Sequence, residues 1–170
     1  MTHQNAATPH DGRDDEQPEV RVQALSPDAT LPAYAHPGDA GADLCAAEDV
    51  ELAPFERAVI PTGLAIALPA GHVGLIHPRS GLSSKHGITV VNAPGTIDAG
   101  YRGEIRIPLI NLDPHTTHQI RRGDRVAQLL IQKVETARFA PVTALDDAQL
   151  DATSRGTGGF GSTGGFAPAP

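Results

Sequence analysis

Residues 96–112 read Thr96-Ile-Asp-Ala-Gly-Tyr-Arg-Gly-Glu-Ile-Arg-Ile-Pro-Leu-Ile-Asn-Leu112, and this stretch decides the fold class. Its second half is rich in isoleucine, a β-branched residue that favours strands. Asp98-Ala-Gly-Tyr101 lies between two apolar runs and contains the residue types that form tight turns. The stretch therefore predicts a short strand at Thr96–Ile97, a hairpin turn, and a long strand over Glu104–Leu112.

The same pattern recurs along the chain, where fifteen prolines and eighteen glycines separate short β-branched runs. Such punctuation is typical of an all-β sandwich or barrel. The other expected strands are Val20–Leu25, Val50–Leu52, Ala58–Ile60, Gly63–Leu68, Val73–Ile76, Thr89–Val91, Thr117–Ile120 and Arg125–Glu135. Helical periodicity is nearly absent, so a single helix of one or two turns is expected, starting near Ser80. With four Phe, two Tyr and no Trp, the core should consist of Val, Ile, Leu and Ala.

The chain of 170 residues fits one β-domain over residues 19–150, flanked by two arms. Residues 1–18 are polar and acidic and lack the segments of a signal peptide, so a disordered arm is expected there. No stretch approaches the length of a membrane span. The single cysteine, Cys45, excludes an intrachain disulfide and fits a reducing, cytoplasmic location.

The charge distribution bears on the partner. The formal net charge is −7, and residues 1–19 hold five acids and one arginine, which places −4 of it in that stretch. The remainder is only mildly acidic and offers no basic surface for a nucleic-acid polymer. A single nucleotide could still be held by a few arginines.

The C-terminal arm, residues 151–170, contains the glycine-rich run Arg155-Gly-Thr-Gly-Gly-Phe-Gly-Ser-Thr-Gly-Gly165. Its glycines carry no apolar area, so it cannot form a core, but it could close over a ligand with backbone N–H groups, hydroxyls and a guanidinium. It resembles neither a dinucleotide fingerprint nor a P-loop closely enough, because both motifs open a helix, and Ser162 stands where the P-loop lysine belongs. Taken alone, a disordered low-complexity tail remains the other interpretation.

Four further segments use glycine and polar residues where strands need neither. They read Pro37-Gly-Asp-Ala-Gly-Ala-Asp-Leu-Cys-Ala46, Pro78-Arg-Ser-Gly-Leu-Ser-Ser-Lys-His-Gly-Ile88, Asn92-Ala-Pro-Gly-Thr-Ile-Asp-Ala-Gly-Tyr-Arg-Gly-Glu104 and Arg122-Gly-Asp-Arg-Val-Ala-Gln-Leu-Leu-Ile131. With the terminal run, and in this order, they resemble the five motifs of the homotrimeric dUTP pyrophosphatases (dUTPases). The resemblance extends from about Val20 to Gly165. It implies a jelly-roll-like β-barrel or sandwich with one short helix, assembled as a homotrimer whose active sites are shared between chains.

The resemblance also implies an activity, the hydrolysis of dUTP to dUMP and diphosphate with Mg²⁺. Asp98 matches the general base that activates the attacking water, and Tyr101 matches the ring that packs under the deoxyribose. The residues expected to bind substrate are Arg79, Ser80, Gly81, Asn92, Gly95, Thr96, Ile97, Tyr101, Gln128, Arg155, Phe160, Gly161, Ser162 and Thr163. Asn92 and the backbone near it match the uracil-reading groups, and Phe160 matches the ring that stacks on uracil. Many family members carry an acid where this chain has Gly100.

The metal is expected to have no direct protein ligand. Mg²⁺ keeps waters and takes phosphate oxygens, and Asp43 matches the family aspartate that touches the ion only through water. The pair His115 and His118 has a spacing that could suit a metal, but its surroundings indicate a loop and a strand edge instead.

Two rival functions need consideration. A dCTP deaminase shares the fold and several motifs, but it needs a glutamate ten residues after the aspartate that matches Asp98, and this chain has Pro108 there. A non-catalytic dUTP-sensing trimer should lack Asp98 or the terminal run, and both are present. The sequence gives no information on the role of the acidic N-terminal arm.

Overall fold

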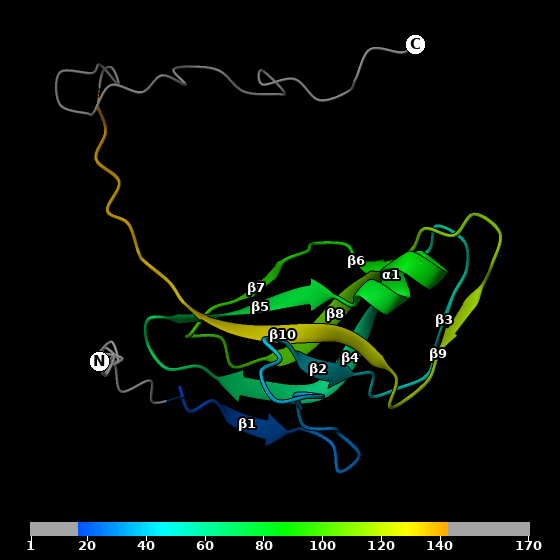
Figure 1. Cartoon of the computed structure of the whole chain (residues 1–170), viewed down its shortest axis with the longest axis horizontal. Coiled ribbons are helices and arrows are strands. Elements are labelled where there is room, and N and C mark those ends of the chain that lie inside the picture. Colours follow the sequence, from blue (N-terminus) through cyan, green and yellow to red (C-terminus); the bar gives the residue numbers. More distant parts are fainter. Residues whose placement is uncertain (1–16, 143–170) are drawn as a thin grey trace, which may run out of the picture. The chain divides into compact units, whose positions relative to one another are not determined.

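The computed structural model describes residues 17–142, and most of their regular structure is β-strand (Figure 1). The elements are β1 (Arg21–Ala24), β2 (Ala42–Cys45), β3 (Val50–Leu52), β4 (Arg57–Ala67), β5 (His72–Pro78), α1 (Ser80–His86), β6 (Ile88–Val90), β7 (Gly95–Ile97), β8 (Glu104–Asn111), β9 (His118–Ile120) and β10 (Arg125–Lys133). Within this described part of the chain, no helix is both long and apolar enough to cross a membrane. The expected all-β class with one short helix starting at Ser80 is confirmed.

The strands belong to one compact unit that ends at Thr136. Two four-stranded antiparallel sheets form its body. One has the strand order β1-β4-β8-β6, the other β2-β10-β5-β7, and β3 and β9 form a separate two-stranded ribbon. The inner faces of both sheets and the ribbon share one core, which includes Leu44, Leu52, Ile60, Ile107, Leu109 and Leu129. The jelly-roll-like sandwich is therefore confirmed, and its core contains the predicted Leu, Ile, Val and Ala.

The two strands expected at Ala58–Ile60 and Gly63–Leu68 are one strand, β4, and that expectation was wrong. The register with β8 shifts between Pro61 and Ala65, as in a β-bulge. Two contacts hold the irregular stretch: the Thr62 hydroxyl donates to the carbonyl of Ile105 at 2.7 Å, and the N–H of Gly63 donates to the Glu104 carboxylate at 2.9 Å. Partners on β8 thus keep the strand continuous where proline and glycine indicated a break.

The hairpin turn expected at Asp98–Tyr101 is also a different feature. β7 pairs with β5, whereas β8 pairs with β4 and β6, so the two strands beside the turn belong to opposite sheets. The segment is a crossover between the layers of the sandwich. Because β7 and β8 share no ladder, they separate and leave space between them.

A strand that the sequence did not predict is β2, whose four residues are all buried. β10 pairs with it along one edge, and Asp43 forms an isolated bridge with Ala33 on the other. Alanine and aspartate have low strand propensity, so a short Ala-Asp-Leu-Cys stretch carries no local indication of a strand.

Asn111, at the end of β8, is completely buried and joins the ribbon to the sandwich. Its side-chain amide donates to the carbonyls of Leu52 at 3.1 Å and Thr116 at 2.8 Å, and its carbonyl oxygen accepts from the N–H of Asp113 at 2.9 Å. A buried amide with its hydrogen bonds satisfied in this way is stabilising rather than costly.

Candidate active site

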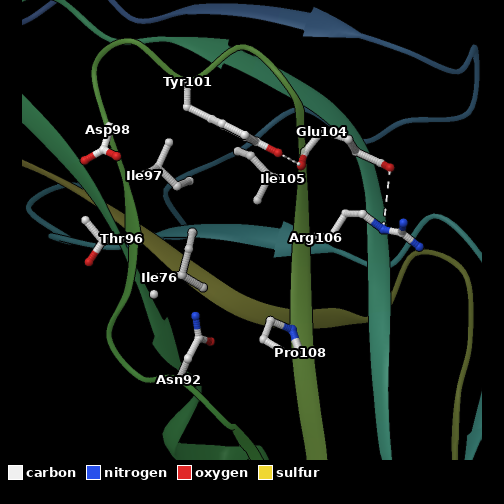
Figure 2. Close-up of a pocket in the computed structure, with 11 residues that line it drawn as sticks. Ile76, Asn92, Thr96, Ile97, Asp98, Tyr101, Glu104, Ile105, Arg106 and Pro108 are labelled. Atoms are coloured by element: carbon white, nitrogen blue, oxygen red, sulfur yellow. Dashed lines mark hydrogen bonds and ion pairs between the residues drawn. The ribbon is translucent and has the colours of Figure 1, made fainter.

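A cavity of about 220 Å³ lies between β7 and β8, where the two strands diverge below the crossover turn (Figure 2). Its lining consists of Ile76, Asn92, Gly95, Thr96, Ile97, Asp98, Tyr101, Glu104, Ile105, Arg106 and Pro108. Six of these were expected at the site from the sequence, namely Asn92, Gly95, Thr96, Ile97, Asp98 and Tyr101. The structure therefore brings the whole central group of predicted residues around one cavity.

The cavity has an apolar floor and a few polar groups at its margin. Ile76, Ile97 and Ile105 are at most 7 % exposed and extend the core up to the cavity. The amide of Asn92 lies next to Gly95, where a Cβ would approach Asn92 Nδ2 to 3.4 Å. Asp98 lies on the β7 side and is exposed, so water reaches its carboxylate (Figure 2). An apolar floor with convergent polar groups is the usual character of a small-ligand site.

The crossover turn is held by its own hydrogen bonds. The N–H of Tyr101 donates to the carbonyl of Asp98 at 3.0 Å. One guanidinium nitrogen of Arg102 donates to the carbonyls of Ala99 and Tyr101, both at 2.6 Å. The phenol of Tyr101 donates to the carbonyl of Glu104 at 3.0 Å, which places its ring across the top of the cavity (Figure 2). Asp98 and Tyr101 are thereby fixed relative to each other.

A second cluster forms around the carboxylate of Asp43, on β2. Arg79 donates from Nε to Oδ1 at 3.0 Å, and Arg125 donates from Nη1 to Oδ2 at 3.1 Å. Gln128, opposite Asp43 on β10, reaches Oδ1 at 3.4 Å. Arg79 also donates to the backbone carbonyl of Arg125 at 3.2 Å. The Asp43 cluster therefore contains Asp43, Arg79 and Gln128, which were all expected at the site from the sequence. Its fourth member is Arg125, for which the sequence indicated no role.

Asp43 is only 7 % exposed, and both of its oxygens accept hydrogen bonds from arginine. The carboxylate thus fixes the orientation of two guanidinium groups and offsets part of their charge.

Burial, followed by the nearby Asp43 carboxylate, raises the pKa of the neighbouring Cys45 thiol, which keeps it neutral. Among residues 17–142, no three His, Cys, Asp or Glu side chains gather as metal ligands. His118 packs edge-to-face on His86, with 5.2 Å between ring centroids.

Within residues 17–142 of one chain, the cavity and the Asp43 cluster are separate sites. The cavity lining contains none of the four members of the Asp43 cluster. Ser80 and Gly81 are exposed at the start of α1, whose N-cap is Arg79. The expected residues Arg155, Phe160, Gly161, Ser162 and Thr163 lie outside the described residues.

The chain is similar to known proteins of one family. The family model described as dUTPase matches residues 27–164. The deoxyuridine 5'-triphosphate nucleotidohydrolase of Thermobifida fusca is 63 % identical over 87 % of this chain and 80 % of its own length. That of Mycolicibacterium vanbaalenii is 60 % identical over 87 % of this chain and 96 % of its own length.

Solved structures agree with the sequence comparisons. The dUTPase of staphylococcal bacteriophage 80alpha, bound to dUpNHpp, superposes with a TM-score of 0.77 at 33 % identity, over 86 % of this chain and 98 % of the phage chain. A variant dUTPase of phage phi11 of S. aureus, which coordinates a structural Mg(II) ion, has a TM-score of 0.70 at 34 % identity, over 75 % and 99 %. The family model, these relatives and the sandwich with its cavity together show that the chain belongs to the dUTPase family.

Proposed function

We propose that this protein hydrolyses dUTP to dUMP and diphosphate, with water attack on the α-phosphorus and Asp98 as the general base. The observation that carries the proposal is the cavity between β7 and β8, because it gathers Asn92, Asp98 and Tyr101 in one site. The reaction would keep uracil out of DNA and supply dUMP for dTMP synthesis. A cytoplasmic location fits this role and the single cysteine.

The cavity suits a pyrimidine deoxynucleoside. In this proposal the Asn92 amide and the backbone groups of Gly95, Thr96 and Ile97 pair with the edge of uracil, which lies on the apolar floor. The Tyr101 ring packs under the deoxyribose and leaves no room for a 2′-hydroxyl. A site that excludes a hydroxyl by shape discriminates through the clash and the lost solvation of that group.

The triphosphate would bind the second group of residues. Arg79 and Gln128, already oriented by Asp43, contact phosphate together with Ser80 and Gly81. The terminal run adds Arg155, Gly161, Ser162 and Thr163 over the β and γ groups, and Phe160 stacks on the base, which contributes about 1–3 kcal/mol. Arg79 and Arg155 then offset charge that develops in the transition state.

The residues of the site fit Mg²⁺ only as an ion carried by the triphosphate. Both Asp43 oxygens are engaged by arginines, so the ion would take its direct ligands from phosphate oxygens and water, with Asp43 contacting it through water. When bound, the ion neutralises phosphate charge and favours one conformation of the chain of phosphates.

A homotrimer would complete the site. The cavity and the Asp43 cluster are separate in one chain, and we propose that Arg79 and Gln128 come from one chain, Asp98 from a second and the terminal run from a third. The outer face of the β1-β4-β8-β6 sheet supports a covering copy. Val59, 53 % exposed, lies opposite Pro108, which in turn accepts a hydrogen bond from the N–H of Val91, 46 % exposed.

The test of the proposed function is diphosphate release from dUTP, dCTP, dTTP and UTP at equal concentration. We expect turnover of dUTP alone among the four, because the cavity reads both the base and the sugar. Equal turnover of UTP and dUTP would contradict the proposal.

Deamination of dCTP is the rival that this structure addresses most directly. Pro108 lies on the cavity wall at the position where that reaction needs a glutamate, and it has no group that could transfer a proton. Glu104, which also lines the cavity, accepts a hydrogen bond from the N–H of Gly63 at 2.9 Å and lies 3.8 Å from Arg106. Ammonia release from dCTP would support the rival.

Removal of residues 155–170 is expected to leave the oligomer intact and to lower turnover of dUTP by about 100-fold or more, because the phosphate-closing and stacking groups are lost. Sedimentation gives the oligomeric state and diphosphate release the rate. Dissociation into single chains would show that the run serves assembly rather than catalysis.

A further inference from the structure

Gly103, the residue before β8, lies against the phenol end of the Tyr101 side chain. A Cβ built on Gly103 would lie 2.7 Å from Cζ and 3.1 Å from Cε2 of Tyr101, and closer still to the phenol oxygen. Contacts this short do not occur between a real Cβ and a ring, because the repulsion is too steep. The ring of Tyr101 therefore occupies the space that a side chain at position 103 would need.

The backbone does not require glycine at this position. The glycines with positive φ among the described residues are Gly38, Gly63, Gly71, Gly87 and Gly123. Gly103 is not one of them, so alanine could adopt its backbone conformation without strain. What excludes a side chain here is the contact with the tyrosine ring.

The ring, rather than the turn, would have to move if a side chain were added. The backbone of Tyr101 is held on both sides, by its N–H to Asp98 and by its carbonyl to Arg102. Tyr101 is 46 % exposed, so a rotation of its side chain outward would carry the ring into solvent. The hydrogen bond from the phenol to Glu104, at 3.0 Å, would break in that rotation.

The Tyr101 ring closes one end of the cavity, so its position bears on what the cavity can bind. Tyr101 extends from the turn across the top of the cavity toward β8, with Ile97 and Ile105 near it (Figure 2). A ring rotated outward would no longer close that end of the cavity. The space gained would lie at the place where the sugar is expected to sit.

We propose that Gly103 is a positioning residue for sugar specificity: by leaving room for the Tyr101 ring, it keeps the 2′-hydroxyl of ribonucleotides out of the site. This inference rests on the proposed function, because it assigns the sugar of dUTP to the space beside Tyr101. It adds a residue that touches no substrate and acts only through the ring.

The kinetic test compares Gly103→Ala with Gly100→Ala. Gly100 is a matched control, because it lies in the same turn, is not in the positive-φ region, and a Cβ there meets nothing within 4 Å. We expect Gly103→Ala to lower the ratio of kcat/KM for dUTP over UTP by about tenfold or more, the scale at which a lost steric clash relaxes specificity. Gly100→Ala should keep the wild-type ratio. An unchanged ratio in Gly103→Ala overturns the inference.

A spectroscopic test is independent of activity. The chain has two tyrosines, Tyr34 and Tyr101, and no tryptophan, so in a Tyr34→Phe background the emission reports Tyr101 alone. Acrylamide should quench this emission more strongly in Gly103→Ala than in Gly100→Ala, with similar melting temperatures. Equal quenching would show that the ring has not moved and would overturn the inference even in an active enzyme. Loss of dUTP preference in the wild type would instead contradict the proposed function.

Discussion

Replacement of Asp98 by Asn is expected to lower kcat for dUTP hydrolysis by about 10²–10⁴-fold, the range that a positioned general base contributes. The amide has the size of the carboxylate but cannot take a proton from water. The N–H of Tyr101 bonds the backbone carbonyl of Asp98 and not its side chain, so the turn should keep its shape. Diphosphate release measures the effect.

Binding separates this chemical role from a structural one. The affinity for dUpNHpp, a dUTP analogue, should stay within about threefold of the wild type in Asp98→Asn, because binding should not depend on the proton acceptor. Glu48→Gln is a suitable control, since it removes one charge from an exposed acid that does not line the cavity. A fully active Asp98→Asn enzyme would refute the assigned base.

Replacement of Asp43 by Ala is expected to weaken both stability and substrate affinity. It leaves the guanidinium of Arg79, whose side chain is 25 % exposed, without its partner and releases Arg125, which is 53 % exposed. Losing one member of a buried pair costs about 3–5 kcal/mol, but the partial exposure of both arginines lowers this to about 1–3 kcal/mol. KM for dUTP should rise, because Arg79 and Gln128, the proposed phosphate contacts, lose the carboxylate that orients them.

Chemical denaturation of the Asp43→Ala protein gives the free energy of unfolding. The exposed pair of Arg122 and Asp28, 3.2 Å apart, provides the control. Both side chains are more than half exposed, so Asp28→Ala should change stability by less than about 1 kcal/mol. If the two variants lost the same stability, the Asp43 cluster would not be the anchor described above.

The strands were predictable where apolar strand-forming residues recur at short spacing along the sequence. Val50–Leu52 was predicted with its observed bounds, and Glu104–Leu112 ends one residue beyond β8. Tertiary partners decided the rest. Continuity of β4 across Gly63 depends on Glu104, 41 residues away, and nothing near Asp98 in the sequence indicates that β7 and β8 join different sheets.

The site was predictable through its motifs and not through its contacts. The motif around Asn92 placed the cavity residues together because they are close in sequence. Arg125 was missed although it stands in a quoted motif, because its partner Asp43 is 82 residues away and lies on a strand that the sequence did not indicate. Gly103 was missed because the sequence does not distinguish a glycine that avoids a clash with a neighbouring ring from a glycine that forms a turn.

The buried Asn111 has a consequence for the order of folding. It connects β8 to both strands at one end of the ribbon, to Leu52, which pairs with His118, and to Thr116, just before β9, over sequence separations of 59 and 5 residues. A two-stranded ribbon is marginal by itself in water. Closing its long loop is entropically unfavourable until β8 is in place to hold both strands. We therefore expect the ribbon of β3 and β9 to form once β8 is in place, rather than as an independent folding unit.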